Sequence, residues 1–139
     1  MSHVTTTRSP IPITDRAALI SAAKKLGAEV LFNAEARGWG GQMHHGEIVL
    51  RHKDSPFDVA LNRNSQGHYE FNADLFGGHV ARVYGVPGDE TELGGSYGRL
   101  VALYGAEVGR KIALLRGYQV KQAVDHQSGV ITQRVVIGR

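Results

Sequence analysis

The sequence contains no cysteine and no long hydrophobic run. The missing cysteine excludes disulfides, thiol catalysis and zinc–thiolate sites. No apolar stretch reaches the roughly 18 residues that mark a candidate transmembrane helix. Residues 1–8 also lack the apolar stretch of a secretory signal peptide. These absences predict a soluble, cytoplasmic protein that does not contact a membrane.

Motifs for common chemistries are missing as well. No Gly-Lys-Ser/Thr occurs, so there is no P-loop, and no Gly-x-Ser-x-Gly marks a hydrolase nucleophile. The chain has seven histidines, but no His-Glu-x-x-His and no aspartate-rich calcium loop. His44 and His45 are adjacent, so in a strand they would face opposite sides and could not chelate together, whereas in a loop they could. We therefore expect no metal and no cofactor, and the balance favours a protein that is not an enzyme.

Length and composition indicate one globular domain over residues 1–139. A chain of 139 residues falls in the range of a single domain, and 42% apolar residues are enough for a core. Charge is uneven along the chain. Residues 108–139 hold six basic residues and one acidic residue, a local charge of +5, which leaves −2 of the total of +3 for residues 1–107.

Periodicity in the first half predicts one helix and five strands. The clearest is a helix over about 14–27, with Thr14 as N-cap and Gly27 as the residue after its end. Residues 3–7, 28–33 and 47–51 suit strands, and alternation predicts two more at 57–62 and 69–73. Between the second and third strands, residues 37–46 are predicted to form a glycine-rich loop.

The second half predicts a long helix and a hairpin. Residues 77–95 are rich in glycine and predict a mobile connector, with one short element near 79–84. A helix over about 96–116 follows, and we interpret Gly105 and Gly109 in it as flat spots for close packing. Its apolar stripe favours a core helix over a docking face. The stripe comprises Tyr97, Val101, Tyr104, Val108, Ile112 and Leu115.

These elements define the expected fold class. Residues 118–125 and 130–137 close the chain as a hairpin. The predicted order is β-α-β-β-β-β-α-β-β. We expect an α+β domain in which two helices cover one face of a mainly antiparallel sheet.

Short motifs near both ends resemble a known family. The residues concerned are 1–3, 100–104, 117–122 and 129–134, with the sequences MSH, LVALY, GYQVKQ and GVITQR. This set is similar to the hypothetical chloroplast reading frame thirty-five family of algal plastids, cyanobacteria and other bacteria. The similarity runs nearly the whole length and is weakest in the glycine-rich middle. It implies no activity, cofactor or catalytic residue, but it suggests an ATPase of the AAA type as a protein partner.

Two groups of residues are candidates for a binding site. Arg37, with the N–H groups of a glycine-rich loop that also carries Trp39, Gln42 and His44, could hold an anion. Asp74 and His79 flank the end of the fifth predicted strand, where a carboxylate and an imidazole could perform acid–base chemistry. The opposing interpretations are a flexible loop and a chance pairing of common residues.

Three functions therefore remain open. The favoured hypothesis is a non-catalytic binding or adaptor domain for a protein partner. The alternative is a small-molecule or anion-binding protein, or an enzyme, that uses the 37–45 loop with Asp74 and His79. Nucleic-acid binding through the basic C-terminal third is the least favoured. That third contains one aromatic residue, Tyr118, whereas nucleic-acid surfaces usually combine dense cations with aromatics.

Overall fold

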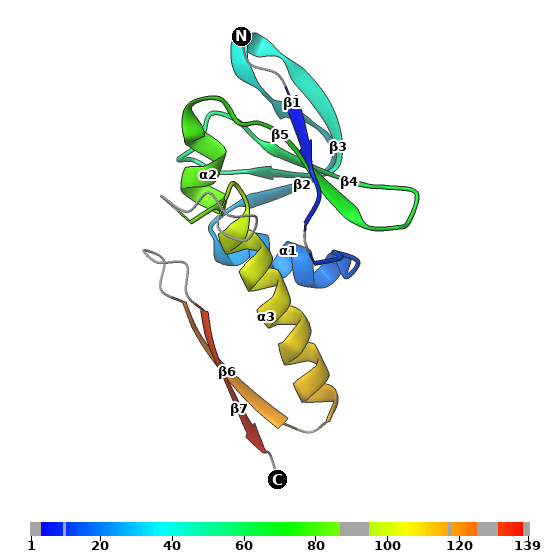
Figure 1. The fold of residues 1–139 in the computed structure, drawn as a ribbon, viewed down its shortest axis with the longest axis vertical. Coiled ribbons are helices and arrows are strands. Elements are labelled where there is room, and N and C mark those ends of the chain that lie inside the picture. Colours follow the sequence, from blue (N-terminus) through cyan, green and yellow to red (C-terminus); the bar gives the residue numbers. More distant parts are fainter. Residues whose placement is uncertain (1–3, 10, 87–94, 117, 125–130, 138–139) are drawn as a thin grey trace.

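A five-stranded antiparallel sheet packed against three helices gives the chain an α+β fold (Figure 1). The computed structural model describes residues 4–9, 11–86, 95–116, 118–124 and 131–137, the last two as strand backbone. The sheet has the order β1-β5-β4-β3-β2. Its strands are β1 (Val4–Thr7), β2 (Glu29–Arg37), β3 (Met43–Arg51), β4 (Val59–Arg63) and β5 (Tyr69–Asp74).

Three helices and a separate hairpin complete the fold. The helices are α1 (Arg16–Lys25), α2 (His79–Tyr84) and α3 (Gly98–Leu115), with short 3-10 turns η1 (Trp39–Gly41) and η2 (Phe76–Gly78). The α+β class is confirmed, but the predicted order was wrong in omitting α2, the short element expected near 79–84. Strands β6 (Tyr118–Val124) and β7 (Ile131–Ile137) pair with each other in a two-stranded sheet beside α3. Within the described ranges, no helix is both long and apolar enough to span a bilayer.

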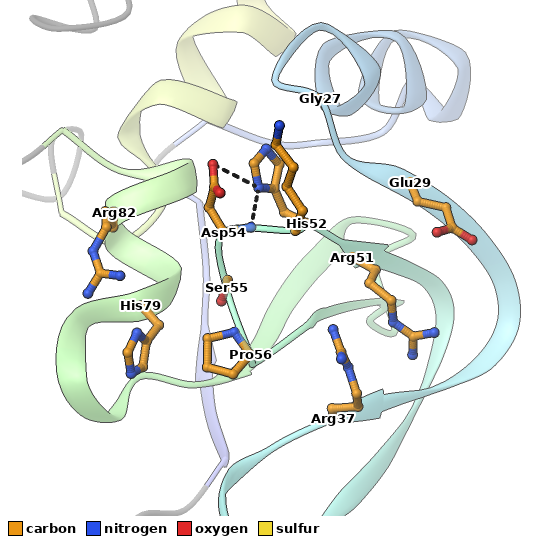
Figure 2. Close-up of a pocket in the computed structure, with 11 residues that line it drawn as sticks. Gly27, Glu29, Arg37, Arg51, His52, Asp54, Ser55, Pro56, His79 and Arg82 are labelled. Atoms are coloured by element: carbon orange, nitrogen blue, oxygen red, sulfur yellow. Dashed lines mark hydrogen bonds and ion pairs between the residues drawn. The ribbon is translucent and has the colours of Figure 1, made fainter.

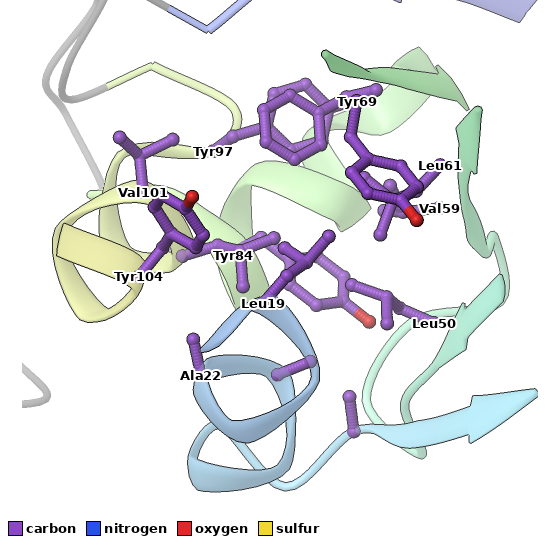
Figure 3. Close-up of a cluster of buried hydrophobic side chains, with 14 of the residues drawn as sticks. Leu19, Ala22, Leu50, Val59, Leu61, Tyr69, Tyr84, Tyr97, Val101 and Tyr104 are labelled. Carbon is purple, nitrogen blue, oxygen red and sulfur yellow. The ribbon is translucent and has the colours of Figure 1, made fainter. Parts of the chain in front are cut away.

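The main core lies between the sheet and the helices (Figure 3). Alternate residues of β3, β4 and β5 point into it, as the two-residue period of a strand requires. Helix α2 contributes Tyr84, α3 contributes Leu100, and Phe71 of β5 stacks on Tyr97 with the ring centroids 4.3 Å apart. The three helices therefore cover one face of the sheet, where the sequence predicted two.

Helix α1 begins one residue later than predicted. The N-cap is Asp15, not Thr14, because its carboxylate accepts a hydrogen bond from the backbone N–H of Ala18. The Tyr104 hydroxyl of α3 accepts the N–H groups of both Thr14 and Asp15, at 3.1 and 3.0 Å. A hydrogen bond from Lys111 is the largest cause that lowers the pKa of Asp15. Contacts from a distant helix thus fix this boundary.

The predicted loop at 37–46 is the tip of a long hairpin. Strands β2 and β3 pair from Glu29 with Arg51 to Arg37 with Met43, so only residues 38–42 turn the chain. The register is the same on both sides of Asn33, which has a φ of +48°, uncommon for a residue other than glycine. Beyond this point, β2 meets the segment before β4, and the Asp58 N–H donates to the Arg37 carbonyl at 3.0 Å. The prediction of a loop therefore holds for residues 38–42 and was wrong for Arg37 and for residues 43–46, which lie in the strands.

The apolar stripe of α3 is buried over only part of its length. Tyr97, Val101 and Tyr104 are at most 4% exposed, and Val108 packs against the core at half burial. Ile112 and Leu115 are 48% and 87% exposed. The first half of α3 is thus a core helix as predicted, whereas its C-terminal end extends past the sheet (Figure 1).

Gly105 does not serve the close packing that the sequence suggested. A Cβ atom built on it would meet nothing within 4 Å, so that interpretation was wrong, while the one for Gly109 stays a prediction. We expect Gly105→Ala to raise the free energy of unfolding by about 1 kcal/mol, because alanine is the better helix former. Chemical denaturation would measure the change. A destabilised variant would show that an element packs closely on Gly105.

Candidate anion-binding cleft

A hollow of about 710 Å³ opens between the end of the sheet and helix α2 (Figure 2). Arg37 and Arg51, from β2 and β3, lie on one side, while His79 and Arg82 of α2 lie on the other. The turn at 52–56 forms the wall between them. We call this hollow, together with its lining residues, the cationic cleft.

A buried carboxylate fixes the two strand arginines. Asp58 is fully buried just before β4. Arg37 donates to both of its oxygens through Nε and a terminal nitrogen, each at 2.9 Å. Arg51 donates to Oδ2 at 3.2 and 3.1 Å, and the Arg37 backbone N–H adds a bond of 2.9 Å. This network pre-orients both guanidinium groups at the edge of the cleft.

Asp58 is ionised despite its burial. Burial opposes its charge, but the hydrogen bonds from Arg37 and Arg51 outweigh that effect and hold the pKa of Asp58 below its ordinary value. The negative charge of Asp58 also acts on Tyr84. Its pKa is raised by burial and, secondarily, by Asp58. One carboxylate therefore balances two arginines, so the Arg37–Asp58–Arg51 group keeps an excess positive charge.

Two further cations line the cleft without a carboxylate partner in the described part of the chain. Lys53 and Arg82 are both exposed and make no ion pair there. Glu29 and Asp54 are the acidic groups in the lining. With Asp58 included, four basic residues face three acidic ones, before any charge on the histidines is counted. The cleft is therefore suited to an anion.

The two cleft histidines have different settings. His52 accepts the Asp54 N–H at Nδ1, at 3.0 Å, so its Nε2 carries the proton that faces the Leu26 carbonyl at 3.0 Å. His79 rests edge-on against Phe57, with ring centroids 5.4 Å apart. Its Nδ1 is buried and has no hydrogen-bond partner in the described chain. His52 thus ties the turn to the end of α1, while His79 has unused hydrogen-bonding capacity.

The predicted site residues divide between two places. Arg37 and His79 both line the cleft. Trp39 and Gln42 lie at the hairpin tip with exposed side chains. Asp74 is buried at the end of β5, where it accepts the N–H groups of Trp39 and Phe76, each at 3.0 Å. The buried Nδ1 of His79 has no hydrogen-bond partner among the described residues, so it makes no hydrogen bond to Asp74.

His44 lies in β3, opposite Ala36 of β2. Burial lowers its pKa, although the negative charges of Asp58, Glu35 and Asp74 act in the opposite direction. Its Nε2 is buried and has no hydrogen-bond partner among the described residues. Since His45 is the next residue of the same strand, the two histidines face opposite sides. In the part of the chain that the model describes, no three metal-ligating side chains gather.

Sequence reasoning missed Arg51, Lys53, Asp58 and Arg82. Arg51 ends a predicted strand and Lys53 follows it in a turn, while Arg82 lies in the connector predicted at 77–95. The available signal was a basic cluster around a turn, Arg51-His52-Lys53. That pattern alone also fits an ordinary solvated turn, because the facing cations on α2 are distant in sequence.

Comparisons with protein-family models, curated proteins and solved structures each found no match to this chain. Its relation to the hypothetical chloroplast reading frame thirty-five family therefore stays a prediction from the quoted residues.

Proposed function

We propose that the protein is a binding protein for a phosphate-bearing small molecule, held in the cationic cleft. The observation that carries the proposal is the combination of two pre-oriented arginines with the unpaired Lys53 and Arg82 around one hollow. Planar guanidinium groups bind phosphate through paired hydrogen bonds, and lysine supplies a point charge. This proposal keeps Arg37 and His79 from the alternative predicted above and replaces the hairpin tip with α2.

The fixed geometry supports binding over catalysis. Asp58 holds the arginines before any ligand arrives, which reduces the entropy lost on binding. The buried carboxylate of Asp58, which holds two arginines of the lining, already accepts hydrogen bonds from both of them. The described lining also contains Ser55, whose hydroxyl donates to the Phe57 carbonyl at 2.8 Å. These groups have structural partners, so the cleft offers cations rather than an activated nucleophile.

Titration calorimetry with inorganic phosphate tests the proposal. We expect Lys53→Ala and Arg82→Ala each to weaken phosphate binding about tenfold, the effect of losing one charge-assisted hydrogen bond. Arg116→Ala is the matched control, because it removes the same charge from the end of α3, outside the cleft. Equal affinities for all three variants, or no binding by the unmodified protein, would contradict the proposal.

A protein partner is a second proposal, favoured by a different surface. The C-terminal end of α3 presents Ile112, Leu114 and Leu115, which are 48%, 52% and 87% exposed. Adjacent exposed apolar side chains are typical of a contact surface. An ATPase of the AAA type, suggested by the family resemblance, is the first partner to test.

A further inference from the structure

Arg99 is a buried cation without a counter-ion in the described chain. It lies in the first turn of α3 and is only 9% exposed. Its Nε is buried and has no hydrogen-bond partner, and no described carboxylate forms an ion pair with it. Charged side chains are rarely buried to this degree unless they are paired. We therefore expect an anion from outside the described chain to compensate the charge of Arg99.

The position of Arg99 in α3 makes an uncompensated positive charge still less favourable. A positive charge is unfavourable near a helix N-terminus, where the helix dipole and the free N–H groups attract anions. Helix α3 has no side-chain cap at Tyr97 and no acidic residue in its first turn. Two independent features, the uncapped N-terminus and the buried guanidinium, thus favour a negative group at the same end of α3.

Arg99 lines a second hollow that adjoins the cationic cleft. This hollow has a volume of about 450 Å³, and its walls include Leu26 and Val83. His52, Asp54 and Arg82 line both hollows. Arg82 therefore contributes to both hollows, of which the first also holds the Arg37–Arg51 pair and the second Arg99. The cations thus line two adjoining hollows rather than a single one.

We propose that Arg99 binds a second phosphoryl group of an elongated ligand, so that the ligand is an oligophosphate. This inference rests on the proposed function, because the first phosphoryl group occupies the cationic cleft. An oligophosphate carries several linked negative groups, so one molecule can contact cations that line two adjoining hollows. Both a nucleoside triphosphate and inorganic polyphosphate have this chemistry.

Titrations with tripolyphosphate and inorganic phosphate, without divalent cations, test the inference. We expect the unmodified protein to bind tripolyphosphate at least tenfold more tightly than phosphate. Arg99→Met keeps the length of the side chain and removes its charge. This variant should lose tenfold or more in tripolyphosphate affinity, while its phosphate affinity stays within about twofold. A parallel titration with ATP distinguishes the sources, since tighter binding of ATP assigns a nucleotide and weaker binding assigns inorganic polyphosphate.

The melting temperature of the ligand-free protein gives a readout that does not depend on binding. If Arg99 has no internal counter-ion, Arg99→Met should melt at the same temperature as the unmodified protein or higher, because an unpaired buried charge has been removed. A lower melting temperature, or failure to fold, would overturn the inference. Either result would mean that the Arg99 side chain already stabilises the ligand-free fold.

The binding outcomes separate this inference from the proposed function. If phosphate binds and Arg99→Met leaves tripolyphosphate affinity unchanged, the function stands and the inference fails. Equal affinity of the unmodified protein for phosphate and tripolyphosphate would also refute the inference alone. If neither ligand binds, both the function and the inference are wrong.

Discussion

Replacing Asp58 by asparagine is expected to lower the free energy of unfolding by about 3–5 kcal/mol, the usual cost of breaking a buried ion pair from one side. Asp58 is completely buried and accepts side-chain hydrogen bonds from Arg37 and Arg51. The asparagine amide would direct N–H donors toward these guanidinium groups. Two cations would then lose their common counter-charge at the point where β2 meets the start of β4.

The effect of Asp58→Asn should depend on pH. Because the pKa of Asp58 is lower in the folded protein than its ordinary value of 3.8, the ionised carboxylate stabilises the fold. That stabilisation is fully present above the ordinary value and is lost as the pH falls through the lowered one. The difference between the variant and the unmodified protein should therefore be largest near neutral pH and shrink below about pH 3.8.

Urea denaturation at several pH values would measure this difference. Asp54→Asn is the matched control, because it removes a carboxylate from the neighbouring turn that is 64% exposed. We expect the control to change the free energy of unfolding by no more than about 0.5 kcal/mol, as surface substitutions usually do. If the two variants were equally stable, Asp58 would not be the anchor of the arginine pair.

Val101→Asp is expected to destabilise the protein by several kcal/mol. Val101 is 2% exposed and belongs to the buried hydrophobic cluster of the main core (Figure 3). A carboxylate at this position would lose its water without gaining a partner. For a chain of this size, a loss of about 3 kcal/mol lowers the melting temperature by roughly 10 °C.

Leu115→Asp is the matched variant at the other end of the same stripe. Leu115 is 87% exposed, so the melting temperature should change by no more than about 2 °C. Differential scanning calorimetry of both variants would measure this contrast. If a protein partner docks on this end of α3, Leu115→Asp should also abolish its capture from a lysate of the native host. A large loss of stability in Leu115→Asp would instead place this residue in the core.

Local sequence patterns predicted most of the individual elements. The helix expected at 14–27 corresponds to α1, with Gly27 just beyond its end at a φ of +86°, the left-handed conformation that glycine tolerates best. Alternation located β4 and β5, and the three- and four-residue spacing located α3. These elements depend on interactions between residues a few positions apart, so they can be predicted from a single sequence.

The strand pairing in the hairpin at 37–46 could not be predicted from local patterns. Its glycines predicted a loop over 37–46, but residues 43–46 form the first part of β3 and pair with the end of β2. The pairing depends on partners in the other strand and on Asp58, whose N–H and carboxylate hold Arg37. Local composition cannot show such contacts, because glycine-rich segments suit both a loop and a tight turn.

The sequence by itself determined the α+β class, the periodic faces of the helices and strands, and the exclusion of thiol and P-loop chemistry. Residue type and short-range spacing are sufficient for these properties. Only the tertiary structure decided that Arg37, Arg82 and Arg99 line two adjoining hollows, although they come from β2, α2 and α3. It also decided which charges are compensated. A charge is balanced by neighbours in space, and Asp58 reaches Arg37 across 21 residues of sequence.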